Sequence, residues 1–218
     1  MKPVRIWFEK KGAARFISHL DLNRCISRAI HQAKIPLWYT QGFNPHAFLT
    51  FALPLPLGVR GERESFDIRL EEDLPEEELL RRLNAVLPED IRLFSAKPPV
   101  KKPGEIAWAR YRIELEPENG DCAAFCGGLR ALLGSEGVWV EKRTKSGTAR
   151  IDLHPYFRDA EIREEGGKAV LEPLLPAGSR ENINPLLLLQ ALEQRIPGGF
   201  YASVSRQGLF DAEKKEFA

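Results

Sequence analysis

The segment YTQGFNPH gathers side chains that could bind a nucleic acid. Its aromatic and hydrogen-bonding residues are Tyr39, Gln41, Phe43, Asn44 and His46. The two rings offer flat faces on which a base could stack, and the amide and imidazole groups could read base edges or hold a phosphate. We therefore predict that these five residues contact RNA. The alternative is a plain turn between a helix and a strand, because a glycine and an Asn-Pro pair also suit a corner.

The helix expected after the first strand carries a row of cationic side chains. Arg24, Arg28 and His31 follow one another at spacings of four and three residues, which places them on one face. Arg15 adds positive charge at the preceding turn. We predict that these four residues contact RNA phosphates. The alternative is a solvated face paired with acids such as Asp21.

His19 is expected at the opening turn of that helix, where an exposed imidazole could act as a general acid or base. An RNA-cleaving site would require a second proton-transfer group or a cation beside it. Tyr39, His46 and Arg24 are the candidates, and spacing alone does not show that they converge. The alternative is an ordinary surface or capping histidine.

A second basic segment, EKRTKSGTARIDLHPYF, is predicted to turn at a hairpin tip. Its cations include Arg143, Lys145 and Arg150, grouped around a glycine. We predict that these three residues also contact RNA, with a solvated loop as the alternative.

The residue pattern does not indicate a metal or a cofactor. Cys122 and Cys126 have the spacing that begins a CxxxCxxC cluster motif, but Leu129 stands at the third ligand position, and three thiolates are needed. The four histidines show no ligand spacing. We therefore expect no metal and no cofactor, and we expect both cysteines to be buried on one helix.

Charge is distributed unevenly along the 218 residues, although the net charge is only +1. Residues 1–60 carry nine Lys or Arg against two acids, and residues 61–120 carry ten against fifteen. The excess of +7 in the first segment indicates a polyanionic partner, unless the fold balances it against the acidic segment. No apolar run reaches the roughly 18 residues of a membrane span, and the first residues lack a signal-peptide core. We expect a cytoplasmic protein with no membrane partner.

Apolar periodicity predicts an α+β fold. The stretch KPVRIWFEK alternates Val4, Ile6 and Phe8 with polar neighbours, as in a half-buried strand. A helical pattern follows, with Ser18 as the expected start and Pro36 as the stop. The continued pattern gives the order β-α-β-β-α-β twice. We therefore predict two tandem ferredoxin-like (βαββαβ) halves with antiparallel sheets.

The proline-rich stretch PPVKKPG indicates a domain boundary. We expect a first domain over residues 1–97, a linker over 98–106, a second domain over 107–210 and a frayed tail over 211–218. In the second domain, VWVEKR and TARIDLHPY are expected to form the middle strand pair, and AVLEPLLP a further strand.

Residues 15–59 closely resemble the radical-SAM-linked protein family. The hallmark F-x-S-H-L-D is matched by FISHLD, Y-S-Q-G-F-N-P-H is matched with Thr40 in place of the serine, and F-A-L-P-L-P-L-G is matched in full. The resemblance implies a bacterial cytoplasmic partner of a radical SAM enzyme, and it implies no settled activity.

A weaker resemblance is to the RAMP superfamily, which includes the CRISPR repeat-processing endoribonucleases. It implies two ferredoxin-like domains that bind RNA and a histidine near the first helix, which His19 or His31 could provide. The glycine-rich loop near the C-terminus of those enzymes is poorly matched here.

Three hypotheses follow from the sequence. The first is a non-catalytic module that binds RNA or presents a substrate to a radical SAM enzyme, in tRNA or rRNA modification. The second is a metal-independent endoribonuclease that uses His19 with Tyr39 or His46. The third is a protein-interaction module that docks the radical SAM partner through the FALPLPLG segment.

Overall fold

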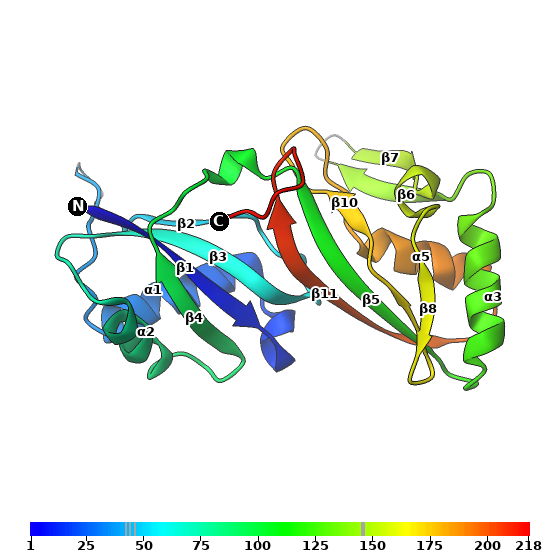
Figure 1. Cartoon of the computed structure of the whole chain (residues 1–218), viewed down its shortest axis with the longest axis horizontal. Coiled ribbons are helices and arrows are strands. Elements are labelled where there is room, and N and C mark those ends of the chain that lie inside the picture. The colour runs from blue at the N-terminus through cyan, green and yellow to red at the C-terminus, as the bar shows by residue number, and fades with distance from the viewer. Residues whose placement is uncertain (42, 44, 46, 145–146) are drawn as a thin grey trace. The chain divides into compact units, whose positions relative to one another are not determined.

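The computed structural model describes residues 1–41, 43, 45, 47–144 and 147–218, and it divides into two compact units (Figure 1). Unit 1 comprises residues 1–106 and 206–218, and unit 2 comprises residues 107–205. The fold is mixed α+β, and its strands pair in antiparallel fashion wherever a register is described.

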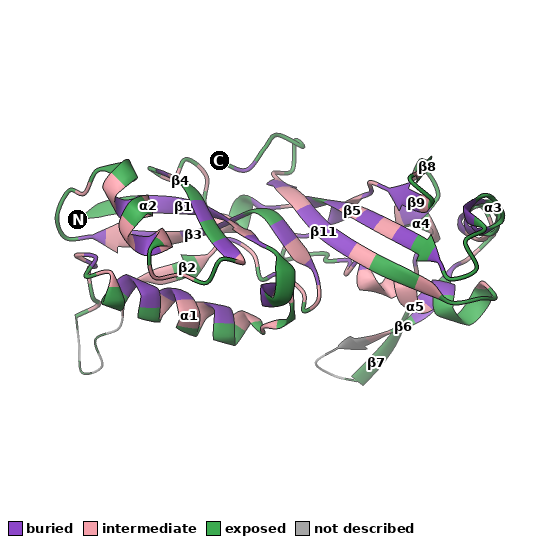
Figure 2. Cartoon of the chain, turned by 90° about the horizontal axis from the view of Figure 1, so that it is seen from below, coloured by how far each residue is buried: buried purple, intermediate pink, exposed green. Residues whose placement is uncertain are grey.

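Unit 1 follows the predicted order of strands and helices. Its elements are β1 (Lys2–Lys10), η1 (Gly12–Phe16), α1 (His19–Gln32), β2 (Leu49–Phe51), β3 (Arg60–Leu70), α2 (Glu76–Asn84), β4 (Ile91–Lys97) and η2 (Pro103–Glu105). β1 lies between β4 and β3, and β2 pairs with β3. α1 and α2 pack against this sheet, and Ile6 and Phe66 of the sheet share one buried core with Ile26 and Leu79 of the helices. Figure 2 shows α1 lying along the sheet.

The start of α1 was predicted correctly. The Ser18 hydroxyl accepts a hydrogen bond from the backbone N–H of Asp21 at 3.1 Å, and it donates to the Asp21 carboxylate at 2.7 Å. This cap satisfies one of the orphan donors at the helix start and directs the first turn, which begins with His19.

Unit 2 has a main sheet and a separate hairpin. Its elements are β5 (Trp108–Pro117), α3 (Cys122–Leu133), β6 (Trp139–Thr144), β7 (Gly147–Asp152), α4 (His154–Phe157), β8 (Ile162–Glu165), β9 (Lys168–Leu171), β10 (Leu174–Pro176), α5 (Leu186–Arg195) and β11 (Phe200–Phe210), of which residues 206–210 belong to unit 1. β9 and β10 both pair with β5, and β8 pairs with β9.

The middle strand pair of unit 2 differs from the prediction. VWVEKR and TARIDLHPY supply β6 and β7, which do pair, but they form their own two-stranded sheet. The first four residues of β7 are all exposed, so this strand has no apolar face to bury in a larger sheet. The strand that the sequence reading missed is β8, which pairs beside β9.

The last residues of the chain were expected to fray, and this expectation was wrong. Phe217 is only 2% exposed, and its ring lies edge-on to Trp7 and under the guanidinium of Arg5. Lys101 Nζ also donates to the Asp211 carboxylate at 2.7 Å. The prediction relied on the position of these residues at the end of the chain. Burial of the apolar Phe217 side chain instead holds them in place.

Among the residues that the structure describes, no helix has the length and apolar character needed to cross a membrane.

Candidate functional site

The segment that follows α1 is a loop closed at its base against β3. Tyr39 forms a β-bridge with Ala47, and the Phe48 N–H donates to the Trp38 carbonyl at 3.4 Å. The Arg69 guanidinium lies 4.3 Å from the centroid of the Phe48 ring and 5.5 Å from that of Trp38. These contacts are cation–π interactions that hold the two arms of the loop together.

The loop presents aromatic side chains to solvent. Phe43 is fully exposed, Tyr39 is more than one third exposed, and Gln41 is exposed as well. Asn44 and His46 lie outside the described residues, as does Gly42. The described part of the predicted RNA-contacting segment is therefore open to a stacking partner.

The predicted cationic face of α1 borders a pocket of about 380 Å³. Arg24 and Arg28 line it on one side, and Val86 and Pro88, which follow α2, line it on the other. Arg24 pairs with Asp21 at 3.2 Å, but both side chains are more than half exposed, so this pair contributes little. Arg28 and His31 are exposed on the same side of the helix.

His19 and Tyr39 have different neighbours among the described residues. The His19 ring contacts Phe51, at a centroid distance of 5.0 Å, at the end of β2. Tyr39 forms its bridge with Ala47, four residues before Phe51. No described contact joins His19 to Tyr39, and His46 lies outside the described residues. The nuclease hypothesis therefore stays a prediction.

His19 faces a buried ionic cluster that we define as Lys10, Glu64 and Arg206. These side chains are only 1–3% exposed. Arg206 donates to both carboxylate oxygens of Glu64, with Nε–Oε1 at 2.9 Å. Lys10 Nζ donates to the Ile17 carbonyl at 3.2 Å, in the turn that leads into α1.

Sequence reasoning missed the ionic cluster, although a signal for it was present. The alternation of Val4, Ile6 and Phe8 continues to Lys10, so the pattern points this lysine inward. In β3, Glu64 likewise falls in phase with buried Phe66 and Ile68.

The cluster also fixes the apolar FALPLPLG segment. Arg206 Nη2 donates to the Leu53 carbonyl at 2.8 Å, and Nη1 donates to the Pro54 carbonyl at 3.2 Å. The Gly58 N–H donates to the Arg15 carbonyl at 2.9 Å, and Gly58 has a φ of +85°, which favours glycine. The FISHLD and FALPLPLG motifs are thus joined at one place in unit 1.

Burial lowers two pKa values in this group. Burial lowers the pKa of Lys10, and the Glu64 carboxylate partly opposes this effect. Burial also lowers the pKa of His19 below its ordinary value of 6.5, and the positive charges of Lys10 and Arg206 add to the decrease. The shift favours the neutral imidazole of His19.

We predict that Lys10→Met raises the pKa of His19, because it removes a positive charge that disfavours the imidazolium. NMR titration of the His19 ring measures this pKa directly. Lys11→Met is the matched control, since this neighbouring lysine is more than half exposed and pairs with Glu9. In the wild type, protonation below pH 6.5 favours the unfolded chain, so the contribution of His19 to stability falls as the pH falls. An unchanged His19 pKa in Lys10→Met contradicts the assignment.

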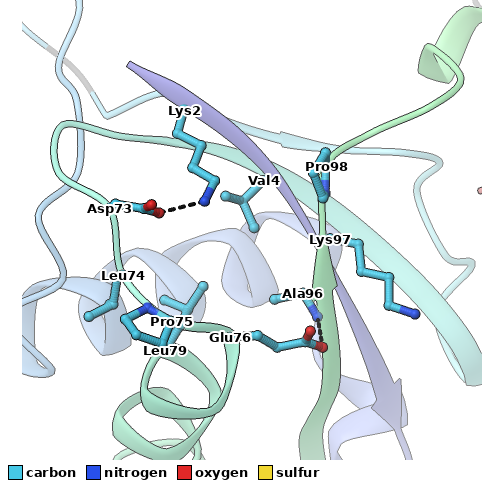
Figure 3. Close-up of a pocket in the computed structure, with 10 residues that line it drawn as sticks. All are labelled: Lys2, Val4, Asp73, Leu74, Pro75, Glu76, Leu79, Ala96, Lys97 and Pro98. Carbon is cyan, nitrogen blue, oxygen red and sulfur yellow. Dashed lines mark hydrogen bonds and ion pairs between the residues drawn. The ribbon is translucent and has the colours of Figure 1, made fainter.

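A second pocket, of about 340 Å³, lies at the start of α2 (Figure 3). Three of its charged side chains have partners. Lys2 points toward Asp73, with Nζ–Oδ1 at 2.5 Å, and Glu76 accepts from the Ala96 N–H at 2.9 Å (Figure 3). This pocket holds none of the predicted site residues, and its polar groups do not call for a ligand.

In unit 2, the predicted basic hairpin is formed by β6 and β7. Arg150 is exposed and lies over the ring of Trp139, at 5.1 Å from its centroid. Lys145 lies outside the described residues, and so does the side chain of Arg143.

The two cysteines of α3 are buried, as predicted, with their sulfur atoms 3.9 Å apart. Burial, with the neighbouring thiol of Cys126, raises the pKa of Cys122 to about 11. In the described ranges, no three or more His, Cys, Asp or Glu side chains are grouped so that they could hold a metal ion.

Residues 3–185 match a sequence family described as an uncharacterized protein conserved in bacteria (DUF2344). The matched range takes in α1, the loop that follows it and the FALPLPLG segment. No curated protein matches the chain.

Proposed function

We propose that this chain, which belongs to the DUF2344 family of uncharacterized bacterial proteins, is a module that binds RNA and presents it to a radical SAM enzyme. The radical SAM partner and its RNA substrate, a tRNA or rRNA, rest on the sequence resemblance of residues 15–59. RNA binding rests on the surface of unit 1.

The observation that carries RNA binding is the pocket beside α1. Arg24 and Arg28 stand one helical turn apart in its lining, together with Asp21, and Cys25, Ala29 and Val86 provide apolar lining. A nucleotide has a charged phosphate and a flat, largely apolar base, so guanidinium groups beside an apolar wall suit both of its parts. His31 extends the cationic row along the helix.

Exposed aromatic side chains add a second feature of single-strand RNA binding. Phe43 and Tyr39 project from the loop after α1, and Phe16 is exposed before α1, under the guanidinium of Arg15. Base stacking on aromatic rings contributes about 1–3 kcal/mol per base and tolerates different sequences. Such a surface suits RNA held by its backbone and stacked bases.

The proposal includes a finer assignment of the fold. We take unit 1, with strand order β4-β1-β3-β2, as one ferredoxin-like half. In unit 2, the chain order β5-α3-β8-β9-α5-β11 and the strand order β11-β5-β9-β8 repeat this scheme if β6, β7 and α4 are an insertion. In this assignment, the first ferredoxin-like half ends at the linker formed by residues 98–106.

Filter binding of tRNA and rRNA fragments across a salt series tests the proposal. For Arg24→Gln/Arg28→Gln, we expect the slope of log K against log salt to lose about 1.4 units, and affinity to fall about tenfold at 0.1 M salt. The matched control is Arg81→Gln/Arg92→Gln, which removes two exposed arginines elsewhere in unit 1 and should bind normally.

RNA binding without salt dependence, or equal losses in both double variants, would refute the site. If the wild type binds no RNA, the protein-docking hypothesis takes its place. Phe16, Leu20 and Leu57 are exposed near the FALPLPLG segment and favour that reading. The nuclease hypothesis has the weaker support, because the described contacts of His19 and Tyr39 are with different residues.

A further inference from the structure

We propose that His19 is part of a phosphate-binding site at the seam where η1, the start of α1 and residues 53–58 meet. The ligand class is a phosphate group, either free or carried by a nucleotide. This site lies apart from the α1 pocket and does not depend on RNA binding, because a free phosphate would satisfy the same cations.

The first argument is the imbalance of buried charge. The ionic cluster holds two cations, Lys10 and Arg206, and one carboxylate, Glu64, whose two oxygens both accept from Arg206. The Lys10 ammonium has three donors, and among the described residues it has one acceptor, the Ile17 carbonyl at 3.2 Å. Removing a charge from water costs several kcal/mol unless partners replace the water. An anion near Lys10 would supply the missing compensation.

The second argument is the position of His19, which lies beside the ionic cluster and reaches the surface. Its side chain is partly exposed, while its Nδ1 atom is buried and has no hydrogen-bond partner among the described residues. Buried polar nitrogens are nearly always paired in folded proteins, so an unpaired one indicates a missing ligand or water. The ring edge against Phe51 fixes the orientation of the imidazole.

The third argument is the rim of the seam. Arg15 has a buried Nε atom without a partner in the described part of the chain, and its guanidinium lies 4.6 Å from the centroid of the exposed Phe16 ring. The Gly58 N–H bond to the Arg15 carbonyl keeps Leu57, also exposed, near this rim. A cation stacked on an aromatic ring beside a phosphate site suits the planar base of a nucleotide.

NMR of the full chain with inorganic phosphate at constant ionic strength tests the site. We expect saturable shifts of the His19 ring resonances and a rise in the His19 pKa, because a bound anion favours the imidazolium. His19→Gln and Lys10→Met should each weaken phosphate binding at least tenfold, and Lys11→Met should not. His19→Gln alters a partly exposed side chain, so it keeps the test decisive if Lys10→Met fails to fold.

Two further probes separate the sources of the phosphate. If an RNA oligonucleotide displaces phosphate from His19, the site takes an RNA phosphodiester. If adenosine 5′-monophosphate displaces it and RNA does not, the site takes a small phosphorylated molecule. Both results support the site. The phosphate site is overturned if the phosphate-induced shifts do not saturate, or if they are unchanged in His19→Gln. If the chain binds no RNA but phosphate still binds at His19, only the proposed RNA function is refuted.

Discussion

Replacing Glu64 with glutamine is expected to lower the free energy of unfolding by about 3–5 kcal/mol, because it leaves buried cations without their counter-charge. Glu64 holds Arg206 through both carboxylate oxygens, and its charge raises the pKa of Lys10 against the effect of burial. Arg206 in turn donates to the carbonyls of Leu53 and Pro54. Loss of the carboxylate therefore weakens the FALPLPLG segment as well as β3. Urea denaturation followed by circular dichroism measures the change.

Two controls distinguish the loss of the buried charge from a general effect of substitutions in β3. Glu62→Gln removes an exposed carboxylate two residues earlier in β3, and it should change stability by no more than about 0.5 kcal/mol. The double variant Glu64→Leu/Arg206→Met removes both charges of the pair and should recover much of the loss, since a buried ion pair can often be replaced by apolar groups. A loss below about 1 kcal/mol in Glu64→Gln would show that water reaches the cluster.

The local structure of unit 1 could be predicted because each element carries its own signal. Alternation marks β1, the Ser18 cap marks the start of α1, and the acids at Glu76 and Glu77 mark the start of α2. These signals act over a few residues, where spacing determines geometry. The cationic face of α1 was predicted for the same reason, since helical spacing alone places Arg24 beside Arg28.

The phase of Lys10 and Glu64 indicates that they are buried, but the pairing of Glu64 with Arg206 could not be predicted because the two residues meet only in the folded chain. Glu64 and Arg206 are 142 residues apart, and no local spacing relates them. The contact of the His19 ring with Phe51 is of the same kind, because it depends on where β2 pairs along β3. In unit 2, the first four residues of β7 are exposed, and this strand lies outside the main sheet. The apolar residues of the segment RIDL, residues 150–153, do not reveal this.

The packing of Phe217 leads to the second large effect. Phe217→Ala is expected to lower the free energy of unfolding by about 3–5 kcal/mol, as for other fully buried phenylalanines. The ring covers Arg5, whose guanidinium is 4.2 Å away and is itself only 1% exposed. Arg5 is bound to Asp67 by two hydrogen bonds of 2.8 and 2.9 Å. Loss of the ring leaves a cavity and also lets water reach this ion pair.

A graded series distinguishes these two contributions. Phe217→Leu keeps most of the apolar volume but loses the cation–π contact with Arg5, so it should cost about 1–2 kcal/mol. Phe94→Ala is the matched control, because Phe94 on β4 is 43% exposed and its loss should cost less than about 1 kcal/mol. Thermal unfolding of the three variants ranks them. If Phe217→Ala were as stable as Phe94→Ala, the final residues would be frayed after all, and Arg5 with Asp67 would be open to water without them.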